Sequence, residues 1–199
     1  MNITLIALMA NNGVIGSEGN KPMFNAEHAK FLKEYVKGKP VVMGRKTFEA
    51  LGGPIDGVAQ TFVFSRQPGS FAEGIPTVLS VDGFFISAFD RMKAHEAVVI
   101  GGASTFHAFY PWADTMHITH IRDNVQGDRY FPQFPGWRPG LINARYEQGE
   151  TQFERIDYRR DSYDPYPATT VEDLNTASIL NHIRKLRGYR AKPMQLNEE

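Results

Sequence analysis

The chain of 199 residues contains no cysteine, which excludes disulfide bonds, thiol nucleophiles and thiolate metal sites. It has no net charge, because 22 Lys and Arg residues balance 22 Asp and Glu residues, so no overall field would attract nucleic acid or an anionic membrane. No apolar run reaches the roughly 18 residues of a membrane span, and no basic segment precedes the apolar stretch near the N-terminus. These absences predict a cytoplasmic protein that binds no metal, nucleic acid or membrane.

What the chain does contain is an alternation of apolar runs and amphipathic segments between residues 1 and 160. The apolar runs predict strands at 4–9, 39–43, 61–65, 77–80, 97–100 and 115–121. The intervening segments predict helices at 26–37, with Asn25 as the N-cap, and at 47–51, 81–94 and 104–110. Two later strands, near 141–147 and 151–158, have the spacing of a hairpin. This order predicts an α/β fold with a mostly parallel central sheet, flanking helices and a C-terminal antiparallel hairpin.

The composition changes after Arg160, which predicts a domain at 1–160 and an appendage at 161–199. Residues 161–167 place two prolines among turn formers and predict a linker. Residues 170–173 match a capping box, and apolar side chains follow at helical spacing, so 170–187 is predicted to be an amphipathic helix before a frayed end. Its apolar face could pack on its own domain, or it could contact a second copy of the chain or a partner.

Two of the apolar runs end in a glycine-containing turn that leads into a predicted helix start. They are VVMGRKTFEALGG, at Val41–Gly53, and VVIGGASTF, at Val98–Phe106. Such a junction directs backbone N–H groups and the positive end of a helix dipole toward phosphate. The pair therefore predicts one dinucleotide held across the edge of the sheet.

The order of motifs around these turns resembles the dihydrofolate reductase family over about residues 2–160. The matching segments are NGVIG at 12–16, KPVVMGRKTFEALG at 39–52, FVFSRQPG at 62–69, VVIGGASTFHAFYPWAD at 98–114, HITHI at 117–121 and GDRYFPQF at 127–134. The resemblance implies a dihydrofolate-reductase-like fold and NADPH as the hydride donor. The residues after Asp161 have no counterpart in the compact form of that family.

The resemblance also implies the cofactor-binding residues. Gly44, Arg45, Lys46 and Thr47 would hold phosphates at a helix start, and Ser65 with Arg66 would take the adenosine 2′-phosphate, for which a guanidinium beside a hydroxyl is well suited. The second turn would pass close to the pyrophosphate through Gly101, Gly102, Ala103, Ser104 and Thr105. The nicotinamide end would be lined by Leu8, Ile15 and Gly16, and the substrate would contact Ile6, Phe31, Leu32, Ile100 and Phe106.

The substrate side departs from the family at its acid. The family uses a carboxylate on the first helix to pair with the pterin N3–H and 2-amino groups and to assist protonation. An ungapped alignment places His28 there, with Glu27 one residue earlier, and helix neighbours point about 100° apart. If the helix keeps the family register, His28, Leu32 and Tyr35 face the pocket; if it has slipped, Glu27 and Phe31 do. Both Glu27 and His28 are therefore catalytic candidates, and the resemblance implies that Thr119 orients the acid through its hydroxyl.

The second departure is at the folate tail, where the family clamps a carboxylate with an arginine. Val58 stands there, and no arginine occurs between Arg45 and Arg66. The resemblance predicts NADPH-dependent reduction of 7,8-dihydrofolate to tetrahydrofolate. Two alternatives remain: a reductase of another pterin or pyrimidine without the glutamate tail, and a catalytically weak homologue that binds a partner through 170–187.

Overall fold

The computed structural model describes residues 1–17, 25–67 and 71–160. The predicted linker, amphipathic helix and tail at 161–199 lie outside the described residues.

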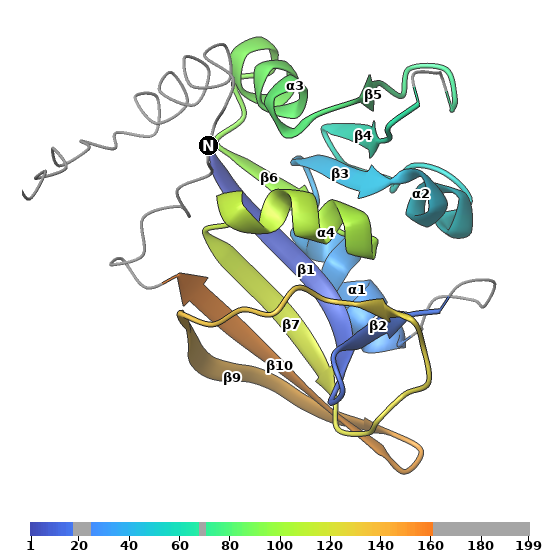
Figure 1. The fold of residues 1–199 in the computed structure, drawn as a ribbon, viewed down its shortest axis with the longest axis vertical. Helices are drawn as coiled ribbons and strands as arrows, with labels where there is room; N and C mark the ends of the chain where they lie inside the picture. Colours follow the sequence, from blue (N-terminus) through green and yellow to red (C-terminus); the bar gives the residue numbers. More distant parts are fainter. Residues whose placement is uncertain (18–24, 68–70, 161–199) are drawn as a thin grey trace, which may run out of the picture. The chain divides into compact units, whose positions relative to one another are not determined.

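Within these residues the core of the fold is an eight-stranded sheet with the order β5-β4-β3-β6-β1-β7-β10-β9 (Figure 1). Its strands are β1 (Asn2–Ala10), β3 (Pro40–Gly44), β4 (Gln60–Phe64), β5 (Thr77–Val78), β6 (Glu96–Val99), β7 (Thr115–Ile121), β9 (Trp137–Gln148) and β10 (Thr151–Arg160). The pairs from β5 through to β7 are parallel, while β10 runs antiparallel to both β7 and β9. This topology confirms the predicted mostly parallel sheet with a C-terminal hairpin.

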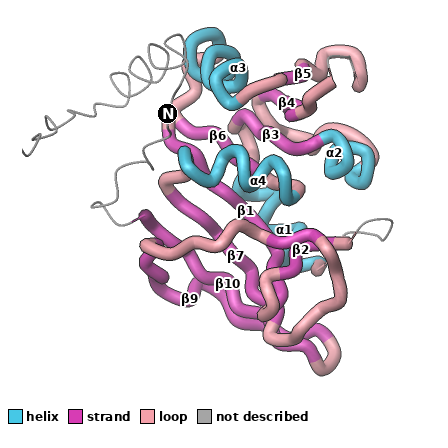
Figure 2. The backbone as a smooth tube through the Cα atoms, in the orientation of Figure 1, coloured by secondary structure: helices cyan, strands magenta, loops and turns pink. Residues whose placement is uncertain are grey.

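Two short strands that the sequence pattern does not reveal form a small second sheet. They are β2 (Val14–Gly16) and β8 (Arg129–Tyr130), which pair antiparallel. Figure 2 shows that β8 lies within an otherwise loop-like segment between β7 and β9. Strands of two or three residues are too short to display an alternation, so periodicity could not predict them.

Helices cover both faces of the sheet (Figure 1). They are α1 (Ala26–Tyr35), α2 (Arg45–Leu51), α3 (Val81–Phe85), which continues as a π-helical segment at Ile86–Arg91, and α4 (Ala103–Phe109), which continues as a 3₁₀ turn at Tyr110–Trp112. The single helix predicted at 81–94 is therefore divided into two helical types. Seen in Figure 1, α1 lies behind the sheet and α4 in front of it.

Helix α1 begins where the sequence predicts, because Asn25 caps it. The Asn25 side chain accepts a hydrogen bond from the backbone N–H of His28 at 2.8 Å, and its φ of −140° is the extended geometry of an N-cap. The cap fixes which residue starts the helix, and with it which side chains of α1 face the sheet.

The core on the α1 side is aliphatic, and the core on the opposite side is largely aromatic. Against α1 and α2 pack Ile6, Val36, Val41, Met43, Phe48, Val63 and Val98. On the α3 and α4 side, the ring of Phe84 meets those of Phe62 and Phe109 edge to face, each at 5.2 Å between centroids. Both cores flank the central parallel strands.

Two further findings concern the described part of the chain. None of its helices is long and apolar enough to cross a membrane. Within the same residues, no three His, Asp or Glu side chains are grouped so that they could hold a metal ion.

Candidate active site

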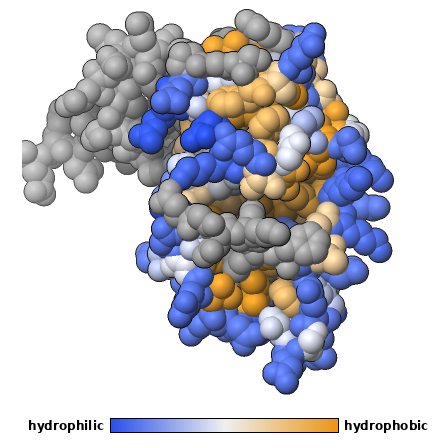
Figure 3. All heavy atoms as spheres, turned by 90° about the vertical axis from the view of Figure 1, so that its right-hand side faces the viewer, coloured by the Kyte–Doolittle hydropathy of each residue, from blue (hydrophilic) through white to orange (hydrophobic). Residues whose placement is uncertain are grey.

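The predicted cofactor residues follow the carboxyl ends of three neighbouring parallel strands. Gly44 ends β3 and residues 45–47 follow it, Ser65 and Arg66 follow β4, and Gly101–Thr105 begin one residue after β6. Because β4, β3 and β6 are adjacent in the sheet, these residues share one edge, which is where open α/β sheets bind ligands. The face that carries α2 and β2 shows apolar surface gathered near its centre between hydrophilic rims (Figure 3).

The two glycine turns touch each other. The backbone N–H of Gly44 donates to the carbonyl of Gly101 at 2.6 Å. A Cβ on Gly44 would lie 2.7 Å from the Thr105 hydroxyl, and a Cβ on Gly101 would lie 2.8 Å from the Phe106 ring. A side chain at either position would therefore force the turns apart, which explains why both positions are glycine.

The turns fit a phosphate-bearing cofactor. Gly44 and Gly102 are the N-caps of helices α2 and α4; both have extended backbones and provide no side chain to cap the first N–H groups. The Thr105 hydroxyl is buried in this region without a hydrogen-bond partner among the described residues. Backbone N–H groups and a hydroxyl are donors that phosphate oxygens accept from.

The remaining predicted cofactor residues lie around this edge. Arg45 reaches the Glu49 carboxylate at 2.7 Å, and the Ser65 hydroxyl accepts from the N–H of Gln67 at 3.2 Å. The side chains of Lys46, Arg66 and Ser104 are exposed, those of Thr47 and Ala103 are half-buried, and Leu8 is buried in β1, while Ile15 and Gly16 belong to β2.

His28, rather than Glu27, faces the sheet. The His28 Nδ1 lies 2.9 Å from the hydroxyl of Thr119 on β7, whereas Glu27 is exposed. The contact of His28 agrees with the orientation expected if the family register is kept, while the Phe31 ring also packs on the sheet. The imidazole lies next to the threonine that the resemblance predicts for orienting the acid.

The imidazole of His28 is neutral at physiological pH. Burial lowers the pKa of His28, and the nearby positive charge of Arg155 lowers it further, to about 4. A group of this kind is unprotonated at pH 7 and offers one donor and one acceptor nitrogen. With Nδ1 bonded to Thr119, only Nε2 remains for a ligand.

Most predicted substrate residues gather beside this histidine. Phe31, Leu32 and Ile100 pack against the cluster that contains Ile6. Phe31 points toward β7 and β10, because its ring meets that of His117 at 5.6 Å. Phe106 is separate from this group, lying beneath Gly101 with its ring 4.9 Å from that of Phe131.

A group of polar residues under α1 was missed by sequence reasoning. His117 Nδ1 lies 2.5 Å from Asp157 Oδ1, and Tyr35 donates to Glu96 at 2.7 Å. Arg155 extends over the Phe31 ring at 3.9 Å. The alternation in β10 could have revealed two of these residues from the sequence, because Arg155 and Asp157 share a face with the buried Phe153.

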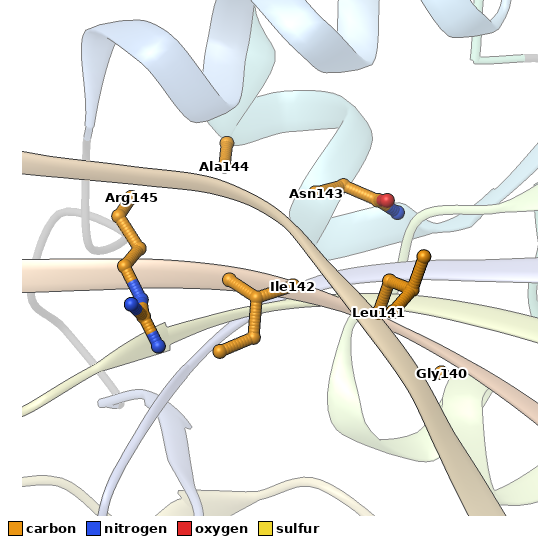
Figure 4. A pocket seen from close by; sticks show the side chains of 6 residues that line it. All are labelled: Gly140, Leu141, Ile142, Asn143, Ala144 and Arg145. Atoms are coloured by element: carbon orange, nitrogen blue, oxygen red, sulfur yellow. The ribbon is translucent and has the colours of Figure 1, made fainter.

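An open hollow on the edge strand β9 contains none of the predicted site residues. It is lined by Gly140, Leu141, Ile142, Asn143, Ala144 and Arg145, and Figure 4 shows Ile142 and Arg145 on the opposite side of the strand from Ala144. With Leu141 83% exposed, this surface does not enclose a substrate.

Comparison with known proteins decides the family. The family model described as dihydrofolate reductase matches residues 2–164. The chain belongs to the dihydrofolate reductase family. It is 34% identical to the dihydrofolate reductase of Neisseria meningitidis over 164 residues, covering 82% of this chain and 94% of that protein. It is 36% identical to dihydrofolate reductase type 3 of Salmonella typhimurium over 140 residues, covering 69% of this chain and 84% of the relative.

A solved structure agrees with this assignment. The dihydrofolate reductase of Enterococcus faecalis, in complex with NADP(H) and RAB-propyl, superposes with a TM-score of 0.70 at 28% identity, covering 80% of this chain and 96% of that one. Family membership confirms the predicted enzyme class, an oxidoreductase of the dihydrofolate reductase type with NADPH as its cofactor.

Proposed function

We propose that this protein reduces 7,8-dihydrofolate with NADPH and that neutral His28 stands in for the family's carboxylate. The observation that supports this proposal is the contact between His28 Nδ1 and the Thr119 hydroxyl, because it places the imidazole where the acid is expected. Bound NADPH supplies the hydride. The chain positions the two ligands and controls where a proton can reside.

His28 can pair with only one of the two pterin donors. Thr119 bonds Nδ1, so Nε2 is the remaining nitrogen, and in its unprotonated form it accepts one hydrogen bond. The second N–H group of the pterin is left to water. A water held at Nε2 is the route by which we expect the proton to reach the substrate.

The test compares variants of the two acid candidates. Because His28 faces the sheet and Glu27 is exposed, His28→Ala should lower kcat/KM for dihydrofolate about a hundredfold, and Glu27→Gln should change it less than about twofold. NADPH oxidation with dihydrofolate as sole acceptor gives the rates, and fluorescence titration checks cofactor binding. If the wild-type protein binds NADPH but does not turn over dihydrofolate, the proposed activity is wrong. If both variants lose kcat/KM equally, the role proposed for His28 is wrong.

A second candidate substrate is a dihydropterin without the glutamate tail. Val58 packs against the buried cluster on the α1 side, as Ile55 and Leu32 do, so an apolar side chain occupies the position where the resemblance places the family's tail-binding arginine. An apolar surface offers the carboxylate of the glutamate tail neither a hydrogen bond nor an opposite charge.

We therefore expect kcat/KM for a tail-less 7,8-dihydropterin to lie within about tenfold of that for dihydrofolate. Val58→Arg should favour dihydrofolate by lowering its KM about tenfold without changing the KM of the tail-less substrate, since a bidentate arginine pairs only with the carboxylate. Steady-state kinetics on both substrates measures the ratio. A wild-type preference for dihydrofolate above about a hundredfold would contradict this expectation.

The finer expectations about partners and location rest on sequence alone. The amphipathic pattern of 170–187 supports a contact with a second copy of the chain or another protein. A small-molecule substrate and a cytoplasmic location complete the proposed setting of the enzyme.

A further inference from the structure

Arg155 lies beside the residue that holds His28. In the antiparallel pair of β10 and β7, Arg155 is directly opposite Thr119. Side chains opposite each other in such a pair share a face, with Cβ atoms about 5 Å apart. Arg155 therefore projects toward α1 next to the Thr119 hydroxyl that contacts His28.

Among the residues that the structure describes, the guanidinium of Arg155 has an aromatic partner but no anionic one. Its central carbon lies 3.9 Å from the centroid of the Phe31 ring, one helical turn after His28. Its Nε is buried and, among the described residues, Arg155 forms no hydrogen bond or ion pair. A partly buried guanidinium without a carboxylate leaves its positive charge acting on its neighbours.

The other charged and titratable groups near His28 do not cancel this charge. On α1, Glu27 and Lys30 are exposed. On β10, Asp157 is engaged by His117 of β7 at 2.5 Å. On β9, the pKa of Tyr146 is raised by burial, so its phenol is neutral at pH 7.

We propose that Arg155 is a positioning residue for His28: its charge beneath α1 adds to burial in disfavouring a proton on the imidazole, and it makes this side of the substrate pocket positive. The inference builds on the role of His28 in the proposed function. Since the family has a carboxylate at this position, the arrangement here reverses the local charge.

The pKa of His28 follows the same direction. Burial lowers it first, and the charge of Arg155 lowers it further, to about 4. Removal of the Arg155 charge should therefore raise the pKa of His28. A lysine keeps a positive charge at the same strand position, so it should keep most of the lowering of that pKa.

The experiment is an NMR titration of the histidine side chains in the full-length protein bound to NADP⁺. The His28 signal is assigned by its loss in His28→Asn. Wild-type His28 should titrate near pH 4, Arg155→Met should raise the midpoint by about one pH unit, and Arg155→Lys should restore at least half of that shift. Arg145→Met is the matched control, because Arg145 on β9 is exposed and pairs with Glu154, and this variant should leave the midpoint unchanged.

Three results would overturn the proposal. The first is a wild-type midpoint above about pH 6, a measurement that does not depend on any variant folding. The second is a midpoint in Arg155→Met within about 0.2 pH units of wild type. The third is a midpoint in Arg155→Lys equal to that of Arg155→Met. Each is read from the imidazole signal and not from turnover. Absence of dihydrofolate turnover in wild type would instead count against the proposed function.

Discussion

Gly101→Ala should abolish measurable NADPH binding while most of the sheet still forms. Gly101 has a φ of +104°, a region that L side chains rarely adopt, and its added Cβ would lie 2.8 Å from the Phe106 ring. Backbone strain of about 1–2 kcal/mol and overpacking of about 1–3 kcal/mol act together. Because Gly44 donates to the Gly101 carbonyl at 2.6 Å, the displacement reaches both glycine turns.

The expected result is a loss in NADPH affinity of at least about a hundredfold, since each 1.4 kcal/mol is roughly tenfold in binding. Fluorescence titration measures the affinity, and thermal unfolding measures the stability. Gly52→Ala is the matched control, because Gly52 also has a positive φ, of +77°, but nothing lies within 4 Å of its added Cβ. That control should lose about 1–2 kcal/mol of stability and keep its NADPH affinity.

A second change separates the clash from the backbone strain. Phe106→Leu on the Gly101→Ala background removes the ring edge that the Cβ meets, so it should recover part of the affinity. Affinity within about threefold of wild type in Gly101→Ala alone would show that the two glycine turns do not carry the cofactor site.

The parallel sheet was predictable from sequence because each of its strands is a compact apolar run. Buried parallel strands such as β3 need apolar side chains on both faces. Strand β7 spans the predicted range 115–121 without change. The start of β9 was not predictable, because Pro139 and Gly140 are poor strand residues. A proline has no backbone N–H to donate, but an edge strand needs no donor on its solvent side. The strand can therefore extend back to Trp137.

The cofactor half of the site was predictable because it depends on backbone geometry. In the sequence, glycines at the ends of adjacent strands indicate the two turns. The strand order then brings Gly44 and Gly101 together. The substrate half depends on which way side chains point. The choice between Glu27 and His28 is a rotation of about 100° around α1, and it is the contact of His28 with Thr119 that decides it.

Arg155 shows why the electrostatics of the site could not be predicted. In the sequence Arg155 stands between Glu154 and Ile156, and an arginine in a strand usually points toward solvent. Here Arg155 is on the inner face, and its role follows only from the register that sets it opposite Thr119. The alternation of β10 assigns Arg155 to the face of Phe153, but only the long-range pairing with β7 brings it next to Thr119.

His28→Asp should tighten dihydrofolate binding to the NADPH complex by roughly tenfold to a hundredfold. A carboxylate at this position could accept from both pterin donors, while the imidazole can accept from one, and hydrogen bonds to a charged acceptor contribute about 1.5–3 kcal/mol. Arg155 lies beside the position and would keep the pKa of the new carboxyl group low, so it would be ionised at pH 7.

The measurement is the dissociation constant of dihydrofolate by fluorescence titration, together with kcat/KM, for His28→Asp and the control His28→Asn. Asparagine has nearly the same shape but offers a single acceptor oxygen without charge, so it should bind no better than wild type. Arg155→Met combined with His28→Asp should raise the carboxyl pKa again and move the activity to higher pH. Equal affinities of the aspartate and asparagine variants would show that His28 does not face the pterin donors, and Thr119 would then position the imidazole for another part of the substrate.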